Sequence, residues 1–517
     1  MLTVYKNMSL TVNKPGRTMA EKRYDENPFL ESKRSAGSVA VVNKALGEWE
    51  LGVSQDIDII PDDREDKEGL GKEAKTSDPM SDDTVTEAAN TDNHEPSSAQ
   101  SDVEFELSKE ERQEMTTLIK SFPGLSSHYR LCRKIGEGTF STVYKAIDLR
   151  GSKGGMTSSW NSPPIKRIRE PEIEVNKKKK IPYVALKRIY VTASPQRIFN
   201  ELNLLYSLSG SPNVAPLLDA LRYEDQVIAV LPYCRHTDFR LYYRDMPLSG
   251  IKIYMHELLT ALDFIHSRKI IHRDIKSTNF LYDVRTRRGV LVDFGLAERE
   301  KPIEEKNCSC STGGVKLAEV TPLGVTKGYL KDDKRSARRA NRAGTRGFRA
   351  PEVLLRCGNQ TTKIDIWAAG VMLLTLMARR FPFFDSPDDT SSLIELTSIF
   401  GHSKMKKIAQ LHGLGLESNI PRLESHKLGE IIHMSLQIDA EAGDMFADDS
   451  PAWETFSALD STGQPLDTEL GRQYGEMLQL LEGCMKLDHY ERISAREALK
   501  LPAFKELNID DDGIILN

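Results

Sequence analysis

The chain has 517 residues, of which 39% are hydrophobic and 28% charged, and its formal net charge is −5. That hydrophobic fraction is enough for a sizeable core and excludes a chain that is disordered throughout. The first ten residues contain no long apolar run, and the most apolar stretch, residues 366–378, is interrupted by Gly370 and Thr375. We therefore expect no secretory signal and no membrane span. Six scattered cysteines agree with a reduced intracellular compartment.

Residues 1–103 are rich in Ser, Asp, Glu, Asn and Pro and poor in aromatic residues. Such a segment cannot bury enough apolar area to offset the entropy lost on ordering, so we predict a disordered acidic tail. Residues 104–128 carry a helical pattern and are predicted to lead into the folded domain.

Four β-rich, apolar segments follow this lead-in helix, and their composition predicts strands. They cover residues 129–136, 141–148, 183–190 and 227–233. The intervening residues 150–181 are rich in Gly and Lys and have no apolar period, so we expect a looped-out insert there.

After residue 250 the apolar period changes from two residues to between three and four. Ile251, Met255, Leu258, Leu262 and Ile265 fall on one helical face, which predicts a buried helix. A second helix is predicted over residues 365–378. The chain therefore has an α+β pattern, with a β-rich first lobe and a helical second lobe.

The segment Gly136-Glu137-Gly138-Thr139-Phe140-Ser141, followed by Val143, joins the first two predicted strands. Glycine has no Cβ, so its backbone can approach phosphate oxygens closely. Ser141 stands where a third glycine is usual, and on this motif alone an ordinary hairpin turn is an equally good interpretation. Because the loop joins two strands and does not open a helix, it argues against a dinucleotide-binding fold.

Lys187 lies within the third predicted strand, in the sequence Val184-Ala185-Leu186-Lys187. An inward-pointing lysine is costly unless its charge is paired. Glu201 can supply the partner from a helix that would present Ile198, Leu202 and Leu205 to the core. The alternative is an exposed strand lysine.

The sequence IHRDIKSTN at 271–279 precedes VLVDFG at 290–295. Phosphoryl transfer requires a carboxylate that orients the acceptor hydroxyl and takes its proton, together with oxygen ligands for Mg²⁺. Asp274 suits the first task, and Asn279 and Asp293 suit the second. Lys276 can neutralise charge on the transferred group. Any one of these residues could cap a loop, but the whole ordered set predicts a phosphotransferase site.

In this order the motifs resemble those of the eukaryotic protein kinase family. Ala350-Pro351-Glu352, the sequence DIWAAG at 365–370 and Arg492 extend the resemblance, which covers residues 129–507. It implies a bilobal protein kinase fold, ATP and Mg²⁺ as cofactors, and an ion pair between Arg492 and Glu352. Lys276 and Gly344-Thr345 resemble the serine/threonine kinases.

The resemblance also implies boundaries and site residues. The N-lobe would cover 129–231 and the C-lobe 235–507, with inserts at about 150–181, 296–344 and 402–471 and a C-terminal tail at 508–517. Asp274 and Lys276 would be catalytic, and Asn279 and Asp293 would hold Mg²⁺. The residues implied to bind ATP are Ile135, Gly136, Glu137, Gly138, Thr139, Phe140, Ser141, Val143, Ala185, Lys187, Glu201, Leu231, Cys234 and Leu281.

The three inserts, together with GTRGFRAPEVL and IHRDIKSTNFL, resemble the cell division cycle 7-type kinases. This narrower resemblance implies an activating regulatory subunit, phosphorylation of replicative helicase subunits at the start of DNA replication, and a nuclear location. An acid-directed kinase of the casein kinase class is an alternative. A pseudokinase scaffold is a weaker alternative, because no catalytic position is lost.

Basic residues gather before residue 350, and Arg273 adds a further cation beside Asp274. The group before residue 350 is Lys331, Lys334, Arg335, Arg338, Arg339, Arg342, Arg346 and Arg349. It is either a solvated charge run or a surface that favours acidic or already phosphorylated peptides. In many kinases a phosphate on the activation segment neutralises the cation at the Arg273 position, and the candidates here are Thr321, Thr326 and Ser336. A bound partner that orders the segment is the other possibility.

Cys308 and Cys310 could form half of a tetrahedral zinc site, but no further Cys or His lies nearby before Cys357. Free loop cysteines are therefore the preferred interpretation. The basic stretches 166–169 and 177–180 resemble a bipartite nuclear import signal. They lack interleaved aromatic residues, so direct DNA binding is not expected. Residues 509–517 are either a frayed tail or a docking strand for the activating subunit.

Overall fold

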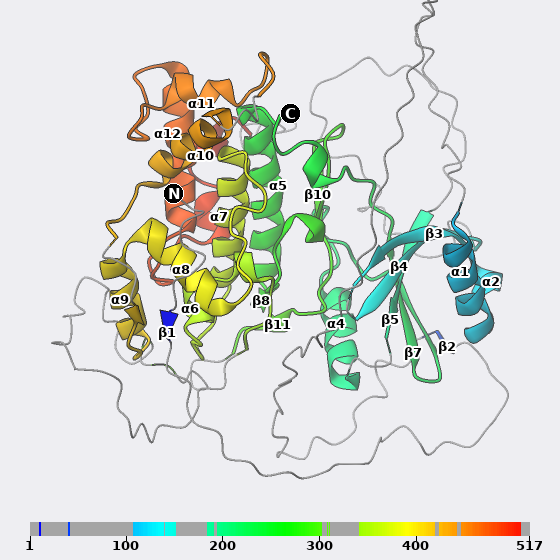
Figure 1. Cartoon of the computed structure of the whole chain (residues 1–517). Helices are drawn as coiled ribbons and strands as arrows, with labels where there is room; N and C mark the ends of the chain where they lie inside the picture. Colours follow the sequence, from blue (N-terminus) through cyan, green and yellow to red (C-terminus); the bar gives the residue numbers. More distant parts are fainter. Residues whose placement is uncertain are drawn as a thin grey trace, which may run out of the picture.

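The computed structural model describes residues 10–11, 40–41, 107–138, 140–150, 183–190, 194–301, 308, 310, 341–418, 423–441 and 446–507. The first insert, the two basic stretches within it and the C-terminal tail lie outside the described residues, apart from Arg150. Of the predicted acidic tail, only two short strands are described. The ribbon shows a sheet-based lobe beside a helical lobe (Figure 1).

The N-lobe contains a six-stranded antiparallel sheet with the order β2-β6-β7-β5-β4-β3. The strands are β2 (Ala40–Val41), β3 (Tyr129–Glu137), β4 (Ser141–Asp148), β5 (Tyr183–Ile189), β6 (Asp219–Tyr223) and β7 (Gln226–Pro232). Four of them match the predicted segments closely. The short strand β6 was not predicted, because it is only five residues long and begins with Asp219, a residue type that is depleted in strands.

The two faces of this sheet carry different partners because side chains alternate along each strand. On β5, Val184 and Leu186 pack into a core with α1 (Lys109–Ser121) and α2 (Leu125–His128). Ala185 belongs to the large core that also contains Leu204 of α4 (Pro195–Ser207). The sheet is therefore covered by α1 on one face and by α4 on the other (Figure 1).

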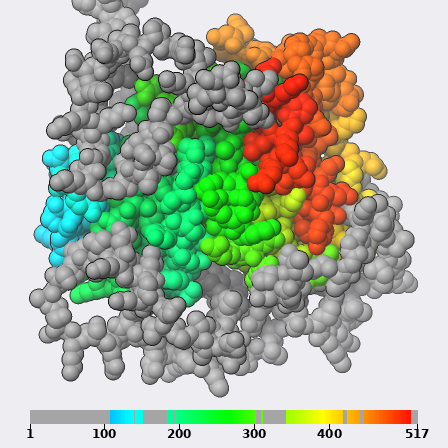
Figure 2. All heavy atoms as spheres, turned by 180° about the vertical axis from the view of Figure 1, so that it is seen from behind, coloured from blue at the N-terminus to red at the C-terminus, as the bar shows by residue number. Residues whose placement is uncertain are grey.

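The C-lobe is built around two long helices, α5 (Leu248–His266) and α7 (Lys363–Met377). All five residues of the predicted apolar face on α5 are at most 1% exposed. The other helices are α6 (Pro351–Leu354), α8 (Asp389–Phe400), α9 (His402–Leu411), α10 (Leu428–Glu441), α11 (Trp453–Ala458), α12 (Glu469–Cys484) and α13 (Ala495–Ala498). The space-filling view from behind shows the C-terminal part of the helical lobe in orange and red on one side and the segment that contains α1, α2, β3 and β4 in cyan on the other (Figure 2).

Much of the region predicted as the third insert belongs to the C-lobe core. Met405 and Ile408 on α9, Leu436 on α10 and Ala458 on α11 are all completely buried. These side chains join the same apolar cluster as α5 and α7. The segment 402–471 therefore contributes to folding and does not simply loop out.

The C-lobe also contains several short strands. They are β8 (Ile270–Ile271), β9 (Phe280–Asp283), β10 (Arg288–Leu291), β11 (Glu298–Arg299) and β12 (Glu417–Ser418), which pairs with β1 (Leu10–Thr11). β8 pairs with β11, and β9 pairs with β10. Among the described residues, no helix is both long enough and apolar enough to cross a membrane.

Candidate active site

Lys187 is buried where β5, α4 and the segment after β10 meet, and it pairs with one buried and one half-exposed carboxylate. Its Nζ is 2.6 Å from Glu201 Oε1 on α4 and 2.6 Å from Asp293 Oδ1. Burial opposes the positive charge, but the two carboxylates outweigh this effect and raise the pKa of Lys187. The pairing of Lys187 with Glu201 is confirmed, and the alternative of an exposed strand lysine is wrong.

Asp293 follows β10 and has a φ of 63°, in the left-handed region that a non-glycine residue seldom adopts. Backbone strain of this kind persists only where neighbouring groups hold it, and Lys187 binds the carboxylate directly. Burial alone would raise the pKa of Asp293, but Lys187 and further contacts lower it to about 2. The carboxylate is therefore ionised at neutral pH and suited to hold Mg²⁺.

A single buried carboxylate, Asp365 on α7, fixes the loop that follows β8. Its oxygens accept hydrogen bonds from the backbone N–H groups of His272 and Arg273, both at 2.8 Å. His266 at the end of α5 lies 2.9 Å from the same carboxylate. Burial raises the pKa of Asp365, but these partners lower it overall, so the brace is charged.

Asp274 is 8% exposed and lies next to Lys276 and Asn279 in this loop. Its Oδ2 is 2.8 Å from Lys276 Nζ and accepts a hydrogen bond of 3.0 Å from Asn279 Nδ2. Burial raises the pKa of Asp274, but Lys276 and the hydrogen bonds outweigh it and lower the pKa. The amide nitrogen of Asn279 is thus occupied, and its amide oxygen remains for a metal ion.

Thr345 completes the surroundings of Asp274 from the far end of the activation segment. Its hydroxyl donates to Asp274 Oδ1 at 2.7 Å, and its backbone N–H donates to the same oxygen at 2.9 Å. Lys276 Nζ donates to the hydroxyl at 2.9 Å. Gly344 has a φ of 112°, and a Cβ there would overlap the carbonyl oxygen of Arg273, so only glycine lets the two segments approach this closely.

Arg273 is already neutralised by groups of the chain itself. Its guanidinium donates to Glu298 on β11 and to the side-chain oxygen of Gln360. Asn341 donates to the other Glu298 oxygen at 3.1 Å, and its carbonyl accepts from Gln360 at 2.7 Å. A carboxylate of the chain itself therefore pairs with the arginine that precedes Asp274. The candidate phosphorylation sites Thr321, Thr326 and Ser336 lie outside the described residues.

The predicted ATP-binding residues come from both lobes. In the glycine-rich hairpin, Gly138 donates to the Ser141 carbonyl at 2.8 Å, and Thr139 lies outside the described residues. Ala185 and Leu231 are paired across β5 and β7, and Val143 packs against the core that contains both. The others lie on β3 (Ile135, Gly136, Glu137), just before β4 (Phe140), after β7 (Cys234) and on β9 (Leu281).

A second buried ion pair stabilises the C-lobe just after the activation segment. Arg492 donates to both Glu352 oxygens, at 2.7 and 2.9 Å, and both residues are at most 1% exposed. Burial raises the pKa of Glu352, but Arg492 lowers it overall. The predicted pairing of Arg492 with Glu352 is confirmed.

Three arginines of the predicted basic group are described, and they lie beside the active site. Arg349 is 2.6 Å from Asp389 Oδ1 and donates to the Gly344 carbonyl, while Arg342 is 3.4 Å from the other Asp389 oxygen. Arg346 is exposed, and its side chain has no hydrogen-bond or ion-pair partner within the part of the chain that the structure describes. Arg346 directly follows Thr345, which contacts Asp274.

Cys308 and Cys310, interpreted from the sequence as free loop cysteines, are free thiols in the structure, but they lie beside two further residues of metal-binding types. Both thiols are buried, and together with Cys357 and His412 they place four ligand atoms within 4.8 Å of one another. Cys308 Sγ is 3.5 Å from His412 Nδ1, and Cys310 Sγ is 3.6 Å from Cys357 Sγ. Three cysteines and one histidine at these distances fit a tetrahedral structural zinc site. This ligand set could not be recognised from the sequence, because His412 lies 104 residues after Cys308, at the end of α9.

Hydrogen bonds within this cluster shift the pKa values of its thiols in opposite directions. Hydrogen bonds from Cys310 and Cys357 lower the pKa of Cys308, and the pKa of Cys357 is raised by the same contacts. The backbone N–H of Asn359 donates to Cys357 Sγ at 3.2 Å, as outer partners of metal ligands commonly do. A zinc ion would bind these residues as thiolates and tie the activation segment to α9.

We expect the purified chain to contain zinc at roughly one ion per chain, because the cluster offers one complete tetrahedral ligand set. Cys310→Ser should remove most of this zinc and lower the Tm, as measured by plasma mass spectrometry and thermal unfolding. Cys132→Ser is the matched control, since Cys132 lies on β3 away from the cluster. Equal zinc contents in wild type and Cys310→Ser would contradict the assignment.

Together these groups can position a phosphate chain and activate an acceptor hydroxyl. Lys187 supplies a fixed cation, Asp293 and Asn279 supply oxygen ligands for Mg²⁺, and Asp274 can accept a proton. Lys276 lies between Asp274 and Thr345, where negative charge would develop. The residues therefore fit ATP and Mg²⁺ as the groups they would hold.

Comparisons with known proteins agree with this geometry. The protein kinase domain family matches residues 173–504. The cell cycle serine/threonine-protein kinase hsk1 of Schizosaccharomyces pombe is 43% identical over 404 residues, which is 75% of each chain. The cell cycle protein kinase spo4 of the same organism is 37% identical and covers 79% of this chain and 92% of its own length. The human cell division cycle 7-related protein kinase is 24% identical, with 77% and 93% covered. The chain therefore belongs to the protein kinase family and, within it, to the serine/threonine kinases of the cell division cycle 7 type.

Proposed function

We propose that this kinase uses ATP and Mg²⁺, requires a separate activating subunit, and promotes the initiation of DNA replication by phosphorylating subunits of the replicative helicase in the nucleus. The arrangement of Lys187, Glu201, Asp293 and Asp274 carries the chemical part of this proposal. The similarity to relatives that are named as cell cycle kinases supports the biological part. A pseudokinase scaffold is disfavoured, because the ion pairs of an active site are all formed.

Asp274 would orient the substrate hydroxyl and accept its proton, since its carboxylate is ionised and held by Asn279. Lys276 would neutralise charge on the transferred group. Thr345 would hold the side chains of Asp274 and Lys276 in position, because its hydroxyl forms hydrogen bonds with both. Asp293 and Asn279 would hold Mg²⁺, which would supply positive charge to neutralise the phosphates. The protein supplies position and charge complementarity, which account for most catalysis of phosphoryl transfer.

Dependence on an activating subunit separates the proposal from an acid-directed casein kinase-like enzyme. We expect the isolated chain to have little activity in a radiolabelled-ATP assay and the chain co-purified with its cellular partners to be active. An isolated chain with full activity would favour the alternative.

Arg346 supports a preference for acidic or already phosphorylated substrates. It is an exposed cation beside Thr345, and Arg342 also remains largely exposed. We expect Arg346→Ala to weaken phosphorylation of peptides with an acidic residue next to the target serine by about tenfold, because such charge-assisted contacts contribute ~1.5–3 kcal/mol. Peptides with neutral neighbours should change little. A peptide array in which basic neighbours are preferred by the wild type would contradict this preference.

The ion pair between Glu298 and Arg273 is evidence that a carboxylate of the chain itself holds the start of the activation segment. Glu298→Gln should lower kcat roughly 10- to 100-fold, because loss of the partner of Arg273 releases the loop that carries Asp274 and small misplacements of catalytic groups are costly. Glu300→Gln, two residues further along, provides a control at the same segment. Unchanged kcat in Glu298→Gln would show that Arg273 does not need this partner.

A further inference from the structure

Helix α1 precedes the residues matched by the protein kinase family, yet it is built into the N-lobe. Met115 and Leu118 on α1 and Phe122 after it are at most 8% exposed and pack against the β5 face that carries Leu186. The helix lies along the outer side of β3 and β4 (Figure 1). Its polar side therefore faces the strand that leads into the glycine-rich loop.

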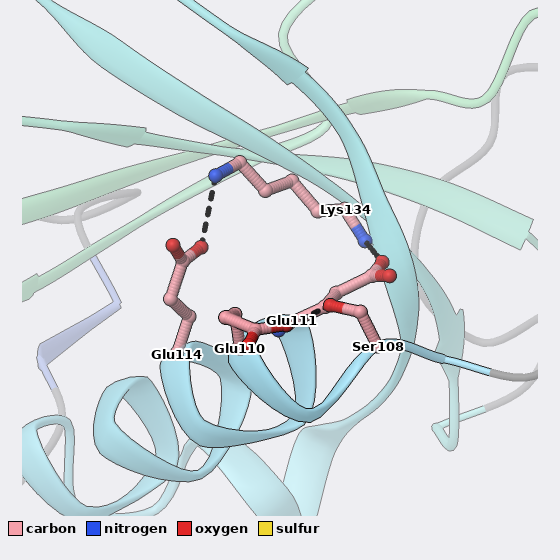
Figure 3. A pocket seen from close by; sticks show the side chains of 5 residues that line it. All are labelled: Ser108, Glu110, Glu111, Glu114 and Lys134. Atoms are coloured by element: carbon pink, nitrogen blue, oxygen red, sulfur yellow. Dashed lines mark hydrogen bonds and ion pairs between the residues drawn. The ribbon is translucent and has the colours of Figure 1, made fainter. Parts of the chain in front are cut away.

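β3 is the edge strand of the sheet, so its outward N–H groups have no neighbouring strand. The pairing of β3 with β4 is irregular between Lys134 and Gly136. At this point the Lys134 N–H donates to Glu111 Oε1 on α1 at 2.5 Å. Lys134 is two residues before Gly136, so this hydrogen bond holds the strand where the loop begins (Figure 3).

The side chain of Lys134 joins α1 to the loop itself. Its Nζ is 2.9 Å from Glu114 Oε2 on α1 and 2.6 Å from Glu137 Oε2, which lies between the two glycines. Ser108 caps α1 by accepting a hydrogen bond from the Glu111 N–H at 3.1 Å, which fixes the turn that carries Glu111. Figure 3 shows Ser108, Glu111, Glu114 and Lys134 around a pocket between α1 and β3.

These contacts differ in strength. Glu114 and Glu137 are 47% and 59% exposed, and ion pairs at such sites contribute little. Glu111 is half-buried, and its carboxylate accepts from a backbone donor, which makes a charge-assisted hydrogen bond. Glu111 is therefore the main link between α1 and the loop.

The opposite side of the loop is also anchored. The Tyr190 N–H donates to the Phe140 carbonyl at 2.9 Å, and the Arg197 guanidinium on α4 lies 4.4 Å from the centre of the Phe140 ring. The tip of the loop is thus tied to β5 and α4, and its base is tied to α1. A loop held at both places keeps the backbone of Gly136 and Gly138 at a fixed distance from the nucleotide site.

We infer that Glu111 is a positioning residue for nucleotide binding, and that α1 acts as a clamp that sets the glycine-rich loop over the phosphates of ATP. This inference rests on the proposed use of ATP. Without Glu111 the backbone N–H of Lys134 loses its hydrogen-bond acceptor. The loop then adopts positions in which its N–H groups are too far from the phosphates to bind them.

The test compares Glu111→Ala, Glu111→Gln and Glu110→Ala in the full chain co-purified with its partners. Glu110 is the control, because it lies on the same turn and its carboxylate has no partner among the described residues. Glu111→Ala should raise the KM for ATP and the Kd of a fluorescent ATP analogue about 5- to 10-fold, with the KM for peptide unchanged. Glu111→Gln should restore most of the affinity, since its amide oxygen can still accept the hydrogen bond. Glu110→Ala should match the wild type.

The direct binding measurement separates two kinds of failure. If the wild type binds the ATP analogue and Glu111→Ala binds it equally well but has a lower Tm, α1 only stabilises the fold and the inference is overturned. If the wild type does not bind the analogue at all, the proposed use of ATP fails first.

Discussion

Asp274→Asn is expected to lower kcat by roughly 10³-fold, because the loss of a positioned general base costs between about 10² and 10⁴ in rate. Asparagine preserves the size of the side chain and can still accept a hydrogen bond from Thr345, so the fold should be unchanged. The ion pairs of Lys187 do not involve Asp274, and the affinity for ATP should therefore be retained. Steady-state kinetics and binding of an ATP analogue measure the two effects separately.

Asp225→Asn serves as the control for this loss, since Asp225 is an exposed residue in the turn between β6 and β7. The pKa of Asp274 is lowered, so its protonation should not affect kcat between about pH 6 and pH 8. Equal kcat values for the wild type and Asp274→Asn would refute the catalytic assignment.

Arg492→Met is expected to reduce the free energy of unfolding by about 3–5 kcal/mol, because it leaves the Glu352 carboxylate buried without its partner. Both residues of the pair are almost fully buried, so solvent cannot replace the two hydrogen bonds. Denaturant titration and thermal unfolding would measure the change. Arg472→Met on α12 is the matched control, because its ion pair with Glu469 is exposed, and it should not change stability measurably.

The pH dependence of this second effect has a defined sign. The pKa of Glu352 is lower in the folded protein than its ordinary value. Its ionic contribution to stability is therefore present at neutral pH and is lost as the pH falls through the range in which an unfolded glutamate becomes protonated. The stability difference between wild type and Arg492→Met should shrink in acid. A difference that is constant from neutral to acidic pH would contradict the pairing as its cause.

The sequence was sufficient to predict those parts of the molecule that local patterns encode. The β-rich, apolar composition of β5 and the apolar face of α5 are local signals, so these elements could be placed to within a few residues. The contacts of Lys187 with Glu201 and of Glu352 with Arg492 could be predicted because each is a recurrent pair within an ordered set of motifs. β6 was not predicted, because a strand of five residues is too short to show a hydrophobic period.

The contacts that were missed depend on the path of the chain in three dimensions. His412, which follows α9, meets Cys308, Cys310 and Cys357 only through the fold, because it lies far from them in the sequence. Glu298 and Gln360 meet Arg273 from two segments that carry no motif of their own. Thr345 was visible as a marker of the serine/threonine class, but its contact with Asp274 depends on the close approach that Gly344 allows.

The partner of Arg273 has a consequence for how this kinase can be controlled. Because Glu298 is encoded in the chain, its negative charge is present from synthesis onward and no phosphatase can remove it. An enzyme that neutralises this arginine with an acquired phosphate can lose the contact by dephosphorylation, whereas the contact between Arg273 and Glu298 does not depend on a phosphatase.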